Sequence, residues 1–176
     1  MKKSLILLFL SFSFSGPAFA DKAFDLWNAG SYEEAIIEWT KLAYGGQAIA
    51  QNNLGVVYSS GKKIKKDCNK AIFWLKKGVQ QNYAESEYNL GEEYISGNCT
   101  RIDNKEGIRL ITKSAEQGYS SAQYYLGNLY DAGIKIPKSD ELSYRWYLKA
   151  ASQGHEKSQY NLGITYQYGD NFIKKD

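Results

Sequence analysis

Hydrophobic residues recur along this chain at helical spacing, and short glycine-marked segments separate the helical stretches. Around Trp74, for example, Ile72, Leu75 and Val79 lie three and four positions apart, which places them on one face of a helix. Glycines and polar residues interrupt the pattern between neighbouring stretches. Each pair of stretches with a break between them predicts a helix-turn-helix hairpin.

The pattern repeats every 36 residues, as the following sets show: Leu54-Gly55, Leu90-Gly91, Leu126-Gly127 and Leu162-Gly163; Tyr58, Tyr94, Tyr130 and Tyr166; Gly61, Gly97, Gly133 and Gly169. Internal repetition of this period is typical of a solenoid. We therefore predict an all-α solenoid of antiparallel helix hairpins. Its units are residues 48–83, 84–119 and 120–155, with a partial unit at 156–176 and a shorter opening hairpin at 21–47.

Residues that favour helix ends fall at the expected borders of these units. Asp67, Asp103 and Ser139 precede the second helix of each unit, where a side-chain oxygen can accept from free amides of the first turn. Residues that tolerate a left-handed backbone mark the ends of the second helices: Asn82, Gly118 and Gly154.

The first twenty residues predict a secretory signal peptide. Lys2 and Lys3 precede an apolar run from Leu5 to Phe14, and small residues at Ala18 and Ala20 suit signal peptidase. We expect cleavage after Ala20, a mature chain that starts at Asp21, and a periplasmic or secreted location. No later segment approaches the roughly 20 apolar residues of a membrane span, so no membrane insertion is expected after cleavage.

The charge of the mature chain gives no case for nucleic-acid binding. The whole chain has 22 basic and 19 acidic residues, and loss of Lys2 and Lys3 leaves a formal charge of +1 over residues 21–176. A nucleic-acid partner would favour a strongly basic surface. The lysine runs at 62–66 and 174–175 lie in expected loops beside acidic residues, which indicates solvated loop charge.

The two cysteines, Cys68 and Cys99, lie in adjacent units of an exported chain, where the redox environment permits a disulfide. Loops of stacked units run side by side, so a bond is feasible, and two unpaired thiols are the alternative. A structural zinc needs four ligands, and the single histidine, His155, is distant in sequence, so we expect no metal site. We also expect no cofactor.

The repeat motifs resemble the Sel-one-like repeat, a relative of the tetratricopeptide repeat. The residues that carry the resemblance are Asn53-Leu54-Gly55, Tyr58 and Gly61, then Asp67, Lys70-Ala71, Trp74 and Lys77, and in the third unit Tyr125-Leu126-Gly127 and the run from Trp146 to Gly154. The resemblance covers nearly the whole mature chain. It implies a right-handed solenoid in which the first helix of each hairpin lines the concave face.

In tetratricopeptide repeats, positions 5, 9 and 12 of the unit point inward. By this resemblance the concave face holds a candidate protein-binding site at Asn52, Val56, Tyr88, Glu92, Tyr124, Asn128, Asp131 and Tyr160, with Ser59, Ile95, Ile164 and Gln167 at the remaining positions. Tyrosine combines a large apolar ring with a polar hydroxyl, which is favoured at interfaces. The tyrosines at position 5 either bind a partner or pack against the adjacent unit.

Few residues suggest catalysis, so we predict that the chain is not an enzyme. Ser59-x-x-Lys62 and Ser60-x-x-Lys63 match a serine–lysine spacing of penicillin-interacting enzymes, but Gly61 interrupts the helix that this motif needs. Cysteine-rich relatives of the repeat family are linked to β-lactam binding and hydrolysis, which is a minor alternative. The preferred prediction is an exported adaptor that holds a protein or peptide on its concave face. A second alternative is a passive component of an envelope assembly that docks through its ends.

Overall fold

The computed structural model describes the backbone of residues 18–168, and every regular element in this range is an α-helix. The helices are α1 (Ala18–Asn28), α2 (Tyr32–Tyr44), α3 (Ala48–Ser60), α4 (Cys68–Gln80), α5 (Ala84–Ser96), α6 (Asn104–Glu116), α7 (Ser120–Ala132), α8 (Asp140–Ala151) and α9 (Glu156–Tyr168). Residues 1–17, most of the predicted signal peptide, and 169–176, the end of the predicted fourth unit, lie outside the described residues. Helix α1 begins just before the predicted mature start.

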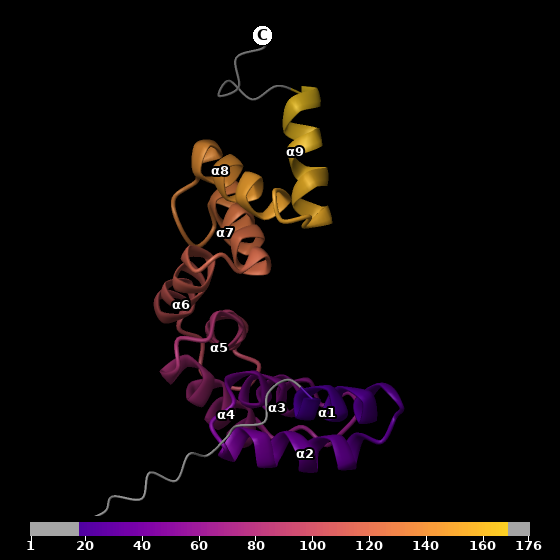
Figure 1. Cartoon of the computed structure of the whole chain (residues 1–176). Helices are drawn as coiled ribbons and strands as arrows, with labels where there is room; N and C mark the ends of the chain where they lie inside the picture. Colours follow the sequence, from indigo (N-terminus) through magenta and orange to yellow (C-terminus); the bar gives the residue numbers. More distant parts are fainter. Residues whose placement is uncertain (1–17, 169–176) are drawn as a thin grey trace, which may run out of the picture.

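The helices follow one another along a curve (Figure 1). Helix α3 packs on α4, α5 on α6 and α7 on α8, and the second helix of each pair packs on the first helix of the next. Helices α3, α5, α7 and α9 lie toward the inner side of the curve, and α2, α4, α6 and α8 toward the outer side (Figure 1). The predicted all-α solenoid with a 36-residue period is confirmed.

The helix ends follow the residues that the sequence marks for them. The side chains of Asp67 and Asp103 accept from backbone amides three residues later, each at 3.0 Å, and Ser139 Oγ does so at 3.2 Å. Asn82 has a φ of +56°, the left-handed conformation that closes the end of α4. Local side-chain chemistry therefore sets the length of each hairpin.

In the three complete units, the glycine of the leucine–glycine pair lies where the two helices of the hairpin meet. A Cβ atom added at Gly55 would lie 2.5 Å from the Leu75 side chain, and one at Gly127 would lie 2.5 Å from the Tyr147 ring. The helix-interior cost of glycine, about 1 kcal/mol relative to alanine, is offset here by close packing of a large side chain. In each complete unit, the space beside the glycine is therefore filled by a large side chain twenty positions later, that of Leu75, Ile111 or Tyr147.

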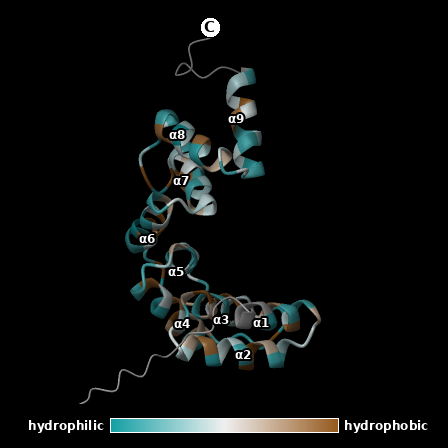
Figure 2. Cartoon of the chain, in the orientation of Figure 1, coloured by the Kyte–Doolittle hydropathy of each residue, from teal (hydrophilic) through white to brown (hydrophobic). Residues whose placement is uncertain are grey.

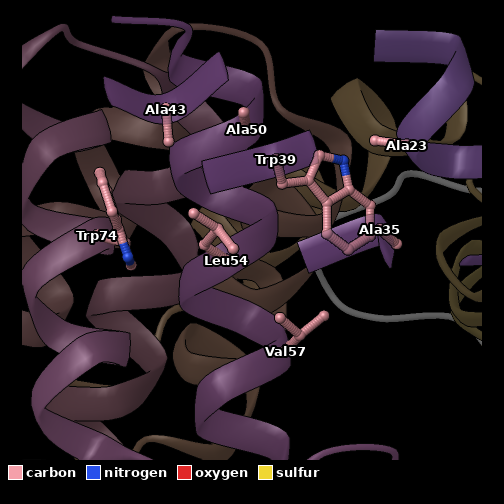
Figure 3. Close-up of a cluster of buried hydrophobic side chains, with 8 residues drawn as sticks. All are labelled: Ala23, Ala35, Trp39, Ala43, Ala50, Leu54, Val57 and Trp74. Atoms are coloured by element: carbon pink, nitrogen blue, oxygen red, sulfur yellow. The ribbon is translucent and has the colours of Figure 1, made fainter. Parts of the chain in front are cut away.

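The hydrophobic core is a row of clusters that bridge neighbouring units. The first cluster draws from α1 to α4 and contains Ala23, Ala35, Trp39, Ala43, Ala50, Leu54, Val57 and Trp74 (Figure 3). The next joins Leu75, Leu90 and Leu110, so it spans the boundary between two units. Most helices carry both hydrophobic and hydrophilic residues (Figure 2), as expected for helices with one side in the core and the other in solvent. Each unit thus depends on its neighbours for burial.

A buried polar contact also recurs within the units, between the two helices of each hairpin. Gln81 Nε2 donates to Gln51 Oε1, and Gln153 Nε2 donates to Gln123 Oε1, both at 2.8 Å. In the middle unit Glu87 takes the place of the glutamine, and Gln117 donates to its carboxylate. These bonds join positions that are 30 residues apart, so each ties the first helix of a hairpin to the end of the second helix of the same hairpin.

Cys68 and Cys99 form a disulfide in the structure, with a Cα–Cα distance of 4.8 Å and a sequence separation of 31. The bond joins the start of α4 to the loop that follows α5. Lys66 Nζ donates to the Asn98 carbonyl oxygen at 3.2 Å beside it. The loops of the first two complete units are therefore held side by side.

Candidate functional site

The inner helices form an open depression of about 570 Å³ where α5 and α7 approach the start of α9. Its lining residues are Tyr88, Ser120, Ser121, Tyr124, Gln153, Gly154, His155, Glu156 and Lys157. The two tyrosines sit 36 residues apart, so the repeat itself brings equivalent positions of successive units to one surface. Besides tyrosine rings, hydroxyls and one imidazole, this surface offers the amide of Gln153 and one charged group of each sign, Glu156 and Lys157.

Tyr88 and Tyr124 are half-buried, and each packs against the last residue of its own unit, at the border with the next. The Tyr88 ring lies 5.4 Å from the Tyr119 ring and 6.1 Å from the Tyr125 ring, both edge-on. The Tyr124 ring lies 4.7 Å from the imidazole of His155. Both tyrosines also line the depression. A single ring therefore packs the solenoid on one side and remains accessible on the other, so the two alternatives for position 5 are compatible.

Glu92 lies one helical turn after Tyr88, on the same face of α5. Burial raises the pKa of Glu92 above its ordinary value, and the neighbouring Glu93 adds to this, while a hydrogen bond from the Tyr88 hydroxyl acts in the opposite direction. Burial also raises the pKa values of Tyr88, Tyr119 and Tyr125. The tyrosines are thus neutral donors at physiological pH, around a carboxylate that is only partly solvated.

Asn52 is not available to a partner, which corrects the expectation for this position. Its side chain is only 4% exposed. Its Nδ2 donates to Glu85 Oε2 at 3.2 Å, and its Oδ1 accepts from Asn89 Nδ2 at 2.8 Å and from Ser86 Oγ at 3.3 Å. The Asn52 amide therefore hydrogen-bonds residues of α5 and joins two units instead of facing a partner.

The other predicted residues differ in their accessibility. Val56 is 38% exposed on α3 and Tyr160 is 70% exposed on α9. Asp131 is also exposed, near the end of α7. Asn128 is half-buried, and its Oδ1 accepts from the Tyr147 hydroxyl at 2.7 Å, so its carbonyl group stabilises the hairpin. The accessible part of the predicted set therefore runs along α3, α7 and α9 and includes the half-buried residues of α5.

Position 12 does not face inward in the first two complete units, contrary to expectation. Ser59 and Ile95 are 9% and 7% exposed, and Ile95 belongs to a core cluster with Ile111 of α6. Ser59 Oγ donates to the Val56 carbonyl oxygen at 3.2 Å, and Ser60 Oγ donates to that of Val57 at 3.1 Å. Both hydroxyls are therefore engaged by the backbone of their own helix, an arrangement unlike that of an activated nucleophile.

Several residues of the depression are absent from the predicted set. Ser120, Ser121 and Gln153 lie at the borders of units, where the next first helix begins. The prediction scanned only the helix-interior positions 5, 9 and 12. The sequence signal that could have found these residues is the unit border itself, because borders of stacked units meet on the same side of a solenoid.

Among the side chains that the structure describes, those of residues 22–167, no group of three or more histidine, cysteine, aspartate or glutamate residues could hold a metal ion. None of the described helices is both long enough and apolar enough to span a bilayer.

Comparisons with known proteins agree with this geometry. The model of the Sel1 repeat matches residues 48–83, 84–119, 120–155 and 156–176. A Sel1 repeat protein from Oxalobacter formigenes is 30% identical with a TM-score of 0.79, and the match covers 88% of this chain and 63% of that protein. The protein c5321, a protective antigen of uropathogenic Escherichia coli with an SLR fold, is 28% identical with a TM-score of 0.77, over 90% of this chain and 35% of that protein.

The chain thus spans less than two thirds of the length of either solved structure. No curated protein matches it.

Proposed function

Because the chain belongs to the Sel1 repeat family, whose members generally mediate protein–protein interaction, we propose that it is an exported adaptor that holds a protein or peptide on its concave face. The observation that carries this proposal is the depression lined by Tyr88 and Tyr124 between α5, α7 and α9. Exposed tyrosine rings are anchors of the kind that dominate protein interfaces. The family is generally one of scaffolds, so no catalytic activity is proposed.

Accessible apolar residues extend the surface beyond the depression. Val56 on α3 lies before it along the curve, and Tyr160 and Ile164 on α9, 70% and 40% exposed, lie after it. An extended concave surface of this type suits a peptide or a protein segment that contacts several units at once. The tyrosine hydroxyls and the amide of Gln153 supply the polar contacts that fix its register.

Photo-crosslinking tests the binding face. A photoreactive residue is placed at Val56 or Tyr160 on the inner helices, and at Ile37, which is 55% exposed on the outer helix α2, as a matched control. The proposal expects one protein, identified by mass spectrometry, to be captured from both inner positions in cells and not from Ile37. Capture that is equal from all three positions, or from Ile37 alone, would contradict it.

A specific observation favours docking through the end of the solenoid as the second candidate. Tyr160, Ile164 and Tyr166 on α9 are 70%, 40% and 54% exposed. Crosslinks from Tyr160 without any from Val56 would support this second function, because a partner that covers only α9 does not reach α3.

Export through a cleavable signal peptide remains part of the proposal. Its support is the charged start, apolar run and small residues of the first twenty positions. Mass spectrometry of the protein isolated from cells is expected to find an N-terminus at Asp21. An intact Met1 on the isolated protein would contradict export by this route.

A further inference from the structure

The inner helices of the complete units are acidic and carry no cationic side chain. Helices α3, α5 and α7 together contain five carboxylates and no lysine or arginine. Among the outer helices of these units, α4 has three lysines and no carboxylate, α6 has three basic and two acidic residues, and α8 has two of each. Within the complete units the inner helices are therefore more acidic than the outer ones, although the formal charge of the whole chain is +3.

Two of the five carboxylates are used within the fold. Glu87 is fully buried, and its Oε1 lies 2.6 Å from Lys113 Nζ. Glu93 is 8% exposed and accepts from Asn98 Nδ2 at 3.2 Å. Glu85 also accepts from Asn52 Nδ2 at 3.2 Å, but like Glu92 it is only partly buried, and Asp131 is exposed. The charges of these three carboxylates can therefore act on a partner.

Glu92 has an aromatic rather than a cationic environment. Among the described residues, no basic side chain contributes to its electrostatics, and its side-chain hydrogen bond comes from the Tyr88 hydroxyl. The rings of Tyr119 and Tyr125 stand edge-on to Tyr88, at 5.4 and 6.1 Å. A half-buried carboxylate without a counterion gains stability from a bound cation, and tyrosine faces attract cations through their quadrupoles.

We propose that the partner is held through a basic segment and that an arginine side chain of that segment stacks on Tyr88 and pairs with Glu92. This inference rests on the proposed binding at the concave face and names the chemistry of its ligand. Guanidinium suits this site better than ammonium because it is planar, stacks on rings and donates two parallel hydrogen bonds to a carboxylate. Helices α3, α5 and α7 offer such a segment carboxylates and no cation, whereas α4, with three lysines and no carboxylate, repels it, so charge favours binding on the inner side.

A peptide of alternating glycine and arginine, blocked at both ends, is the probe, and the same peptide with citrulline in place of arginine is its neutral isostere. Calorimetry or fluorescence anisotropy measures binding of both to the purified protein. The arginine peptide is expected to bind at least about tenfold more tightly, in line with a charge-assisted hydrogen bond. Equal binding of the two peptides would overturn the proposal.

The isosteric substitution Glu92→Gln keeps the size of the side chain and removes its charge. It is expected to reduce the affinity for the arginine peptide about tenfold and to leave that for the citrulline peptide unchanged. Glu116→Gln on the outer helix α6 removes an exposed carboxylate and should change neither affinity. An equal loss of affinity in the two variants would mean that long-range charge alone attracts the peptide, and would contradict an arginine site at Glu92.

A measurement on the unmodified protein keeps the proposal testable if Glu92→Gln folds poorly by circular dichroism. Nuclear Overhauser contacts between arginine side-chain protons and the Tyr88 ring are expected, and none with Tyr44, which is 76% exposed on α2. If no contacts with the Tyr88 ring are seen at a saturating peptide concentration, the proposal that arginine stacks on Tyr88 is overturned. If crosslinks from Val56 and Tyr160 capture a partner while Glu92 proves irrelevant, only the arginine site fails. If no partner is captured, the proposed function fails as well.

Discussion

Glu87 Oε1 on α5 lies 2.6 Å from Lys113 Nζ on α6, the second helix of the same unit, and the Glu87 side chain is fully buried. The equivalent positions of the neighbouring units hold Gln51 and Gln123, which receive a neutral hydrogen bond instead. The middle unit therefore adds an ion pair to a contact that is neutral in the other two hairpins. A buried carboxylate is tolerated only because the lysine and Gln117 both reach it.

Loss of the lysine charge at this pair should destabilise the protein. Lys113→Met keeps the apolar stem but leaves the buried carboxylate without its counterion, so the free energy of unfolding should fall by about 2 kcal/mol. The expected loss is below that of a fully buried pair because the Lys113 side chain is 40% exposed. Chemical denaturation of both proteins measures the difference.

The double variant Lys113→Met, Glu87→Gln is the control. It restores the glutamine of the neighbouring units and should recover most of the lost stability. No recovery would show that Lys113 acts through its stem or through its bond to Asn82 Oδ1 rather than through Glu87.

Gly127 and Gly163 occupy equivalent positions but should respond in opposite ways to alanine. A Cβ atom at Gly127 would lie 2.5 Å from the Tyr147 ring, so Gly127→Ala should destabilise by about 1 to 3 kcal/mol through overpacking. Nothing lies within 4 Å of a Cβ atom at Gly163, so Gly163→Ala should stabilise by up to about 1 kcal/mol through helix propensity. Thermal unfolding followed by circular dichroism measures both, and a shared sign would contradict the packing account.

The disulfide between Cys68 and Cys99 should stabilise the native state by about 3 to 4 kcal/mol, because it closes a loop of about thirty residues in the unfolded chain. Denaturation with and without a reducing agent measures this. The variant Cys68→Ser, Cys99→Ser should match the reduced protein and should not respond to reductant. An equal response of the variant would mean that the reductant acts elsewhere.

The raised pKa of Glu92 predicts a pH dependence of stability with a defined sign. The folded state holds the Glu92 proton more tightly than the unfolded state, so the folded state binds more protons above the ordinary pKa of 4.5. The contribution of Glu92 to stability is therefore present below pH 4.5 and is lost as pH rises through the raised pKa. Since burial is the leading cause, removal of the charge should remove this dependence.

Denaturation of the unmodified protein and of Glu92→Gln at a series of pH values isolates this contribution. The unmodified protein should lose stability relative to Glu92→Gln as pH rises. The same comparison with Glu116→Gln, an exposed carboxylate on α6, is the control. A difference that is constant with pH would contradict the burial of Glu92.

Most of the fold could be predicted from the sequence because its signals are local and repeated. The caps Asp67 and Asp103 and the left-handed Asn82 act within one turn of their own positions, and the structure shows each in the expected role. Helical spacing and the 36-residue period then dictate stacked hairpins. Which side chain fills the space beside Gly55 was harder to predict, because it depends on how closely α3 and α4 approach each other and on how deeply Leu75 enters between them.

The site was predicted less well, because the inward positions of one repeat family do not transfer unchanged to another. Asn52 and Ser59 were expected to face a partner, yet both are buried. A small rotation of a helix about its axis moves such a residue from the surface into the interface with α5 or the core, and sequence spacing does not determine that rotation. Tyr88 and Tyr124 were identified because large rings remain partly accessible after packing.

The most direct test of the central claim is the affinity of the crosslinked partner for two matched variants. Val56→Arg places a bulky cation on the inner side of the curve, and Ile37→Arg places the same group on the outer side, at a position of similar exposure. Binding at the concave face to a basic segment predicts that Val56→Arg weakens the affinity at least about tenfold, since clash and like charge both oppose binding, while Ile37→Arg leaves it unchanged. Equal affinities for the two variants, with both folded by circular dichroism, would contradict the claim that the concave face holds the partner.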